Sequence, residues 1–177
     1  MATTNWTLDP AHSEIGFKVR HMMITNVSGA FKNFAATLET EGEDFTTAKI
    51  SFTAETASVD TGSEQRDGHL RSGDFFDSEN YPVMTFQSTS VVSKGENEYI
   101  LKGDLSIRGK SKPVELNVEY NGVHKDPWGN DRAGFTITGK IRRLDWNLVW
   151  NVGLEAGGVL VGEDVKIQAE VQFTKGA

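Results

Sequence analysis

Asp67, His69 and Ser72 supply the side-chain types of a hydrolytic triad within one polar stretch of this chain. Their spacing argues against that chemistry. On a helix, residues two apart point to different faces, so Asp67 cannot orient the His69 imidazole. Asp67 is better placed to form a solvated pair with Arg71, four residues later. We therefore do not expect a nucleophilic enzyme of this kind.

Metal chemistry has only weak support in the sequence. The histidines at positions 12, 21, 69 and 124 lack the spacing that makes a metal site recognisable, so they would have to converge in three dimensions. The absence of Cys excludes thiolate ligands, disulfides and a thiol nucleophile. We expect no metal and no cofactor.

The stretch from Gly103 to Ser111 superficially resembles a phosphate-binding loop. It has five residues between its glycines, whereas that motif has four, and Pro113 with a strand pattern follows where a helix should begin. We interpret it as a hairpin turn.

Charge and hydropathy limit the classes of partner. The formal net charge is −7, from 25 acidic and 18 basic residues, which disfavours a nucleic acid. Since no apolar run approaches about 18 residues, we expect no membrane insertion. Only five residues precede Trp6 and none forms a leader. A cytoplasmic location is expected for the chain as given, and a periplasmic one if Met1 was added to a processed chain.

The elements around these residues alternate with the period of two that is typical of β-strands. Ile50, Phe52 and Ala54 face one side while Ser51 and Thr53 face the other. The same pattern, bounded by turn residues, predicts strands at about 15–20, 27–38, 49–58, 84–92, 99–107, 114–120, 135–141 and 165–173. Residues 6–10 are interpreted as a short entry segment that ends at Pro10.

Short links between successive strands predict antiparallel pairing, because parallel strands need long crossovers. With neither a linker nor an internal repeat, residues 1–177 are expected to form a single domain. Eight such strands can form a sandwich or close into a barrel. We favour an all-β, eight-stranded antiparallel barrel, because closure removes both sheet edges and leaves room for one small ligand.

The stretch from 58 to 86 is the one segment without strand alternation. Thr61 and Glu64 have capping-box spacing and predict a short helical insert. Arg66, His69 and Leu70 would share a face of that helix. A cluster of charge, imidazole and aromatic residues in the single non-strand insert is where function is first expected.

The apolar face of the strands has two interpretations. It can be a filled core, or it can line a cavity that accepts an apolar ligand. Small residues at predicted inward positions leave room among the larger side chains: Ala54, Gly103, Gly139 and Ala169. The pattern by itself favours neither interpretation.

The chain resembles the YceI-like family over nearly its whole length. The most specific part of the resemblance is Arg66-Asp-Gly-His69-Leu70. Other matching residues are Leu8-Asp-Pro10, His12-Ser13, His21, Gly29-Ala-Phe31, Asp60-Thr61, Ser72, Asp74-Phe75-Phe76, Tyr81-Pro82, Phe86, Gly103-Asp-Leu105, Arg108-Gly-Lys110 and Arg142-Arg143-Leu-Asp145. The chain departs from the family pattern at Trp146-Asn147, where that pattern has Phe-Gly.

This resemblance implies a lipocalin-like barrel whose pore holds a polyisoprenoid or similar lipid. We therefore expect a non-enzymatic protein that binds and carries or stores a polyprenyl or quinone-like lipid, its polar head at one mouth. The residues expected to contact this ligand are Phe17, His21, Phe31, Phe52, Ala54, Arg66, His69, Phe75, Phe76, Met84, Phe86, Leu105, Phe135, Ile137 and Trp146.

Among them, Phe75 and Phe76 should cover one end. Arg66 and His69 either bind the head group or brace the insert. The alternative is a small-molecule enzyme that uses His21, His69 and Arg66 at the barrel mouth. A third interpretation is an interaction domain with a filled core. A monomer or a homodimer is expected.

Overall fold

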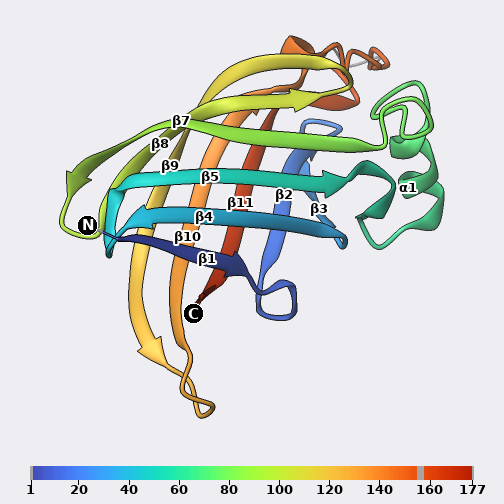
Figure 1. Ribbon diagram of the computed structural model, residues 1–177. Coiled ribbons are helices and arrows are strands. Elements are labelled where there is room, and N and C mark those ends of the chain that lie inside the picture. Colours follow the sequence, from blue (N-terminus) through green and yellow to red (C-terminus); the bar gives the residue numbers. More distant parts are fainter. Residues whose placement is uncertain (1, 155–157, 177) are drawn as a thin grey trace.

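A computed structural model describes residues 2–154 and 158–176 of the chain. Its dominant feature is an antiparallel sheet of 11 strands that curves round on itself (Figure 1). The strands are β1 (Thr3–Leu8), β2 (Glu14–His21), β3 (Thr25–Phe31), β4 (Phe34–Glu41), β5 (Asp44–Glu55), β6 (Val59–Asp60), β7 (Val83–Gly95), β8 (Glu98–Ile107), β9 (Lys110–Lys125), β10 (Asp131–Arg142) and β11 (Val161–Lys175). The helices are η1 (Pro10–His12), η2 (Thr56–Ser58), α1 (Glu64–Arg71) and η3 (Arg143–Trp146).

Hydrogen bonding between the first and last strands closes the sheet. The order β1-β4-β5-β7-β8-β9-β10-β11 returns to β1, which pairs with both β4 and β11. The result is a closed, eight-stranded antiparallel barrel with additional strands and one short α-helix. This confirms the barrel expected from the strand pattern. Closure gives every strand of the ring a hydrogen-bonded partner on both sides.

Residues 6–8, interpreted as a short entry segment, belong to β1, the strand that closes the ring. β1 and β2 both pair with β11, β1 near its carboxyl end and β2 along its amino-terminal part. Between them, Pro10 lacks the N–H group needed for a ladder, and the Asp9 carboxylate accepts a hydrogen bond from the backbone of Ala11. β1 and β2 are thus consecutive halves of one side of the barrel, interrupted by η1.

The strand predicted at 27–38 is two strands, β3 and β4. The backbone N–H of Lys32 bonds to the carbonyl of Ser58, and the carbonyl of Asn33 accepts from the N–H of Glu55. Lys32 therefore bonds to the end of η2 and Asn33 to the last residue of β5, so the chain changes its pairing partner between β3 and β4. The inward positions change here from odd numbers in β3, at Val27 and Phe31, to even numbers in β4, at Ala36 and Leu38, so the alternation shifts by one residue at the bend.

Aromatic residues fill the barrel end that lies away from α1. The Phe45 ring packs with its centroid 5.8 Å from that of Trp6, 5.0 Å from that of Tyr120 and 5.2 Å from that of Phe135. The Trp6 indole N–H donates to the hydroxyl of Thr40, which satisfies the one polar group of this buried ring. This end of the barrel has a packed core.

The opposite end carries the insert, with α1 beside the ends of β5 and β7 (Figure 1). The helical prediction is confirmed, but its cap is Ser63, whose hydroxyl accepts from the N–H of Arg66. Thr61 cannot serve as the cap because its backbone N–H and its hydroxyl both donate to the Asp67 carboxylate, at 2.8 and 2.6 Å.

Asp67 is consequently buried, and the solvated pair predicted between it and Arg71 does not form. Two donors at the helix entrance hold this carboxylate, which keeps it from the exposed surface. Arg71 pairs instead with Glu64, at 2.8 Å.

Two of the small inward residues receive neighbouring side chains and do not create empty space. A Cβ on Gly103 would lie 2.4 Å from Cζ of Phe86 and 2.5 Å from the carbonyl oxygen of Gln87. A Cβ on Gly139 would lie 2.5 Å from Cδ2 of Leu116. The idea that small residues leave room is therefore wrong at these positions, because the ring of Phe86 and the side chain of Leu116 already occupy the space.

Gly103→Ala should lower the free energy of unfolding by about 1–3 kcal/mol, because the methyl group overlaps both a ring and a backbone carbonyl. Gly134→Ala on β10 is the matched control, since its Cβ would lie 3.7 Å from the nearest atom, at ordinary contact distance. Denaturant unfolding of both variants measures the difference. Equal unfolding midpoints for the two variants would show that the Phe86 ring moves aside with no loss of stability.

Candidate ligand-binding site

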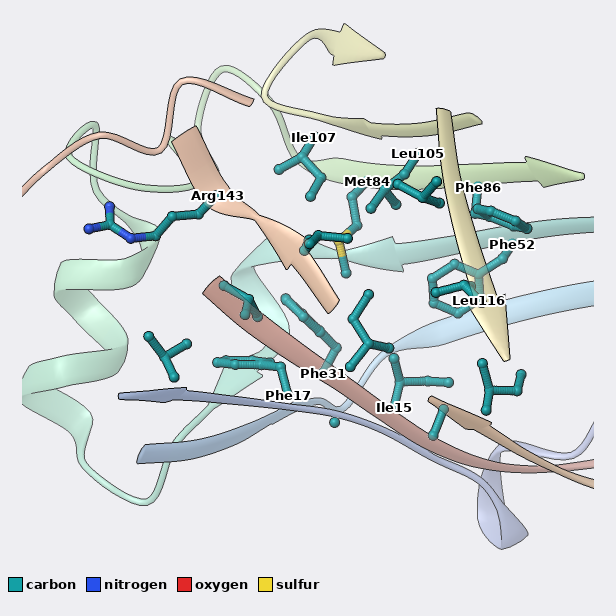
Figure 2. A pocket seen from close by; sticks show the side chains of 18 of the residues that line it. Ile15, Phe17, Phe31, Phe52, Met84, Phe86, Leu105, Ile107, Leu116 and Arg143 are labelled. Atoms are coloured by element: carbon teal, nitrogen blue, oxygen red, sulfur yellow. The ribbon is translucent and has the colours of Figure 1, made fainter. Parts of the chain in front are cut away.

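An elongated cavity of about 670 Å³ occupies the barrel interior. This volume lies within the roughly 300–1,000 Å³ range of small-molecule sites. Figure 2 shows side chains from β2, β5, β8 and β9 projecting into the same space, namely Ile15, Phe17, Phe52, Leu105 and Leu116. The barrel is thus partly hollow, because its circumference encloses more volume than these side chains fill.

Most of the residues expected to contact a ligand line this cavity. They are Phe17, His21, Phe31, Phe52, Arg66, His69, Phe75, Phe76, Met84, Phe86, Leu105, Phe135 and Ile137. Ala54 and Trp146 are buried but do not line it. Ala54 packs in the wall beside Met84, and the Trp146 indole N–H donates to the carbonyl of Leu105 at 2.8 Å.

The cavity mouth contains a buried cation that the expected site residues did not include. Arg143 is 3% exposed and also lines the cavity. Its guanidinium donates to the carbonyls of Gly162 (2.8 Å), Trp150 (3.0 Å), Val161 (3.2 Å) and Leu148. Burial lowers the pKa of Arg143, and the charge of nearby Glu163 partly opposes this shift. Arg143 therefore holds both edges of the mouth together through backbone carbonyls.

The alternation of β10 contains the signal that places Arg143 inside. Phe135, Ile137 and Ile141 line the cavity at odd-numbered positions, and position 143 continues that series. Arg142 is half-exposed and pairs across the outer face with Glu163 at 3.4 Å. The alternation of inward and outward positions therefore predicts that Arg143, and not Arg142, faces the cavity.

The insert contributes Arg66 and His69 from one face of α1. The Arg66 guanidinium donates to the hydroxyl and the carbonyl of Thr61, at 2.7 and 2.8 Å. Asp67 holds that same Thr61, so a short polar network braces the beginning of the helix. Arg66 is nevertheless exposed and borders the cavity, and bracing leaves part of its guanidinium available to a ligand.

His69 closes one side of the mouth against Trp150, which the sequence analysis did not single out. The imidazole centroid lies 4.5 Å from that of Trp150 and 5.1 Å from that of Phe75, both edge to face. Its Nε2 atom lies 2.9 Å from a carboxylate oxygen of Asp74. These contacts join the insert to the segment that follows η3.

The geometry of the insert does not assemble a hydrolytic triad. The carboxylate beside His69 belongs to Asp74, whereas Asp67 faces Thr61. The Ser72 hydroxyl donates to the backbone carbonyl of His69 and not to its ring. Within residues 2–154 and 158–176, no three His, Asp or Glu side chains are grouped closely enough to hold a metal ion.

The ionisable groups around the mouth are basic, apart from the Asp74 carboxylate that lies behind His69. Apart from Tyr99, the described cavity residues with ionisable side chains are Arg20, His21, Arg66, His69 and Arg143. None of these lining residues is a carboxylate. The backbone of Arg20 lies against Gly162, whose carbonyl accepts from Arg143. The cavity thus runs from an aromatic, closed end to a basic mouth, within a chain whose net charge is −7.

Comparison with known proteins identifies the family. The profile of the YceI-like domain matches residues 6–173. The UPF0312 protein SA2479 of Staphylococcus aureus is 40% identical over 172 residues, which cover 97% of this chain and 98% of that protein.

Solved structures of the same fold support that assignment. Burkholderia cenocepacia BcnA matches with a TM-score of 0.80 at 25% identity, covering 93% of this chain and 98% of that one. The Campylobacter jejuni YCEI protein matches with a TM-score of 0.76 at 32% identity, covering 96% of both. A polyisoprenoid binding domain from Saccharophagus degradans has the same fold, with a TM-score of 0.70 at 17% identity, over 96% of this chain and 97% of that one. From its match over nearly the whole length, together with the barrel and its cavity, the chain belongs to the YceI-like family.

Proposed function

We propose that this protein binds a long apolar molecule inside the barrel, a polyprenyl or quinone-like lipid, and carries or stores it. The observation that supports this most is that apolar and charged side chains occupy different parts of the cavity. Its body is lined by aliphatic and aromatic side chains from strands all around the barrel, and its charged groups in the described residues gather at one mouth. A molecule with an apolar tail and a polar head has the same arrangement.

The energetics fit a tail of repeated hydrocarbon units. Burial contributes about 0.8 kcal/mol per methylene, so a five-carbon isoprene unit contributes roughly 3–4 kcal/mol before the cost of ordering. Several units would therefore hold the ligand without any reactive group. The Saccharophagus degradans domain of the same fold is described as polyisoprenoid binding, which supports the same class of ligand here.

The head of the ligand meets donors and positive charge. Arg66 and Arg143 offer guanidinium groups, and His21 and His69 offer ring nitrogens. These groups are complementary to phosphate oxygens or to the carbonyl oxygens of a quinone. A basic mouth therefore favours a head rich in oxygen over a cationic one.

Binding accounts for the site better than the enzyme considered as the alternative. His69 is engaged by Asp74 and stacked against Phe75 and Trp150. Arg66 is held by Thr61. These contacts position the insert at the mouth, and they suit a rim that orients a head group.

Protein purified from bacteria should carry a lipid that mass spectrometry of an organic extract identifies as a long-tailed isoprenoid. We expect an approximately stoichiometric amount, because a tail of several units leaves the cavity slowly. Delipidated protein should then take up an added isoprenoid. Extracts that repeatedly contain no lipid, together with delipidated protein that takes up none, would contradict the proposal.

Arg66→Gln distinguishes a head-group contact from a brace. If Arg66 binds the head, affinity for farnesyl diphosphate should fall about tenfold, or 1.4 kcal/mol, while affinity for farnesol is unchanged. Arg71→Gln is the matched control on the same helix, because Arg71 pairs with Glu64 and does not line the cavity. Titration calorimetry with both ligands measures the effect. An equal loss for the alcohol and the diphosphate would show that Arg66 only braces the insert.

A further inference from the structure

The turn between β2 and β3 exposes three consecutive apolar side chains. Met22 is 45% exposed, Met23 55% and Ile24 73%. The N–H of Ile24 bonds to the carbonyl of His21, so Met22 and Met23 are the two central residues of a tight turn. Both have positive φ angles, 52° and 65°.

These two positions are unfavourable for methionine. A hairpin turn with positive φ at both central residues favours Asn-Gly, because those residues tolerate the left-handed conformation. Met at both positions strains the backbone and leaves apolar surface in water. Since Asn-Gly would form the same hairpin with neither disadvantage, the methionines indicate a role other than folding.

A second segment presents apolar side chains beside this turn. Val149 and Val152 are exposed, and the carbonyl of Val152 accepts from the N–H of Leu160. The carbonyl of Leu160 in turn accepts from the N–H of Met22, at 2.8 Å. Gly158 packs closely on the Met23 side chain. We call Met22, Met23, Ile24, Val149 and Val152 the apolar rim.

The apolar rim adjoins the cavity mouth. Three neighbours of the rim line the cavity. His21 precedes Met22, Trp150 follows Val149, and Leu160 hydrogen-bonds to Met22 and Val152. Arg20, which is exposed, adds positive charge two residues before the rim, and Arg66 lines the same cavity. The β2–β3 turn lies at the end of the barrel that carries α1 (Figure 1), so exposed apolar side chains and basic cavity residues occur at the same end.

We propose that the apolar rim docks on the surface of a phospholipid bilayer, so that a lipid passes between bilayer and cavity without crossing water. This rests on the proposed function, because a tail held by burial of many methylenes does not enter water readily. The tips match the apolar layer just beneath the head groups, and the arginines match the phosphates above it. A second protein chain would explain the exposed tips but not their position around the opening through which the ligand passes.

The double variant Met22→Asn/Met23→Gly tests this role without touching the cavity lining. It supplies the residues that the turn favours, so its melting temperature should equal or exceed that of the parent protein. Its affinity for phosphatidylcholine vesicles, measured by flotation, should nevertheless fall about tenfold or more. Transfer of a fluorescent isoprenoid to acceptor vesicles should slow by a similar factor and lose its dependence on vesicle concentration.

Trp128→Ser is the matched control. Trp128 is the most exposed large apolar residue among those described, at 80%, and it lies on the turn between β9 and β10, away from the mouth. Its loss should leave vesicle binding and transfer unchanged. Equilibrium binding of the fluorescent isoprenoid in solution should be normal in both variants, so a failure of lipid binding itself is detected separately from a failure of docking.

Three results would overturn the proposal. The first is a double variant that still binds vesicles like the parent. The second is parent protein that binds only anionic vesicles and is released by high salt, since charge alone would then be responsible. The third is a parent dimer that the double variant converts to a monomer while neither protein binds vesicles, which would make the rim a contact between two copies of the chain.

Discussion

Closure of the hydrogen-bonded ladder between β1 and β11 is the constraint on which the rest of the structure depends. Once the ring is closed, its circumference determines the volume inside, and eight strands enclose more space than their side chains fill. The two ends use that space differently. Aromatic rings around Phe45 pack one end, whereas α1 and the segment after η3 border the other. The cavity therefore has a direction, from the end packed with aromatic rings to the end that carries the insert.

That direction is reinforced by electrostatics. Arg143 is held at the mouth by four backbone carbonyls, so its charge is positioned by the fold itself. Partial negative charge on carbonyl oxygens compensates a buried cation less fully than a carboxylate does, and the site stays attractive to oxygen-rich groups. The same residue ties the two edges of the mouth together. One side chain thus supports the mouth and places positive charge beside the cavity, whereas the adjacent Arg142 faces outward.

Much of the barrel could be predicted from local pattern. Alternation on the strands identified Phe17, Phe52, Phe86, Phe135 and Ile137 as inward residues, and each lines the cavity. The errors occurred where one contact overrides another. Thr61 had capping-box spacing, yet Asp67 holds it and Ser63 caps the helix. Lys32 and Asn33 were placed inside one strand, but they bond to η2 and to the end of β5, and the inward positions shift by one residue between Phe31 and Ala36. Alternation predicts that Ala54 faces inward like Phe52, but Ala54 packs in the barrel wall beside Met84.

The sequence by itself determined the strand alternation, the turns and the single polar insert, because each depends on residues close together in the chain. The sequence also places Arg143 in the odd-numbered series whose members face the cavity, although the pattern does not say what a buried arginine would bind. Only the tertiary structure decided that residues 6–8 close the ring, that Trp150 meets His69, and that the β2–β3 turn borders the mouth. Each of these pairs segments far apart in the chain. The space that remains inside depends on how all the strands curve together, and no local pattern contains that information.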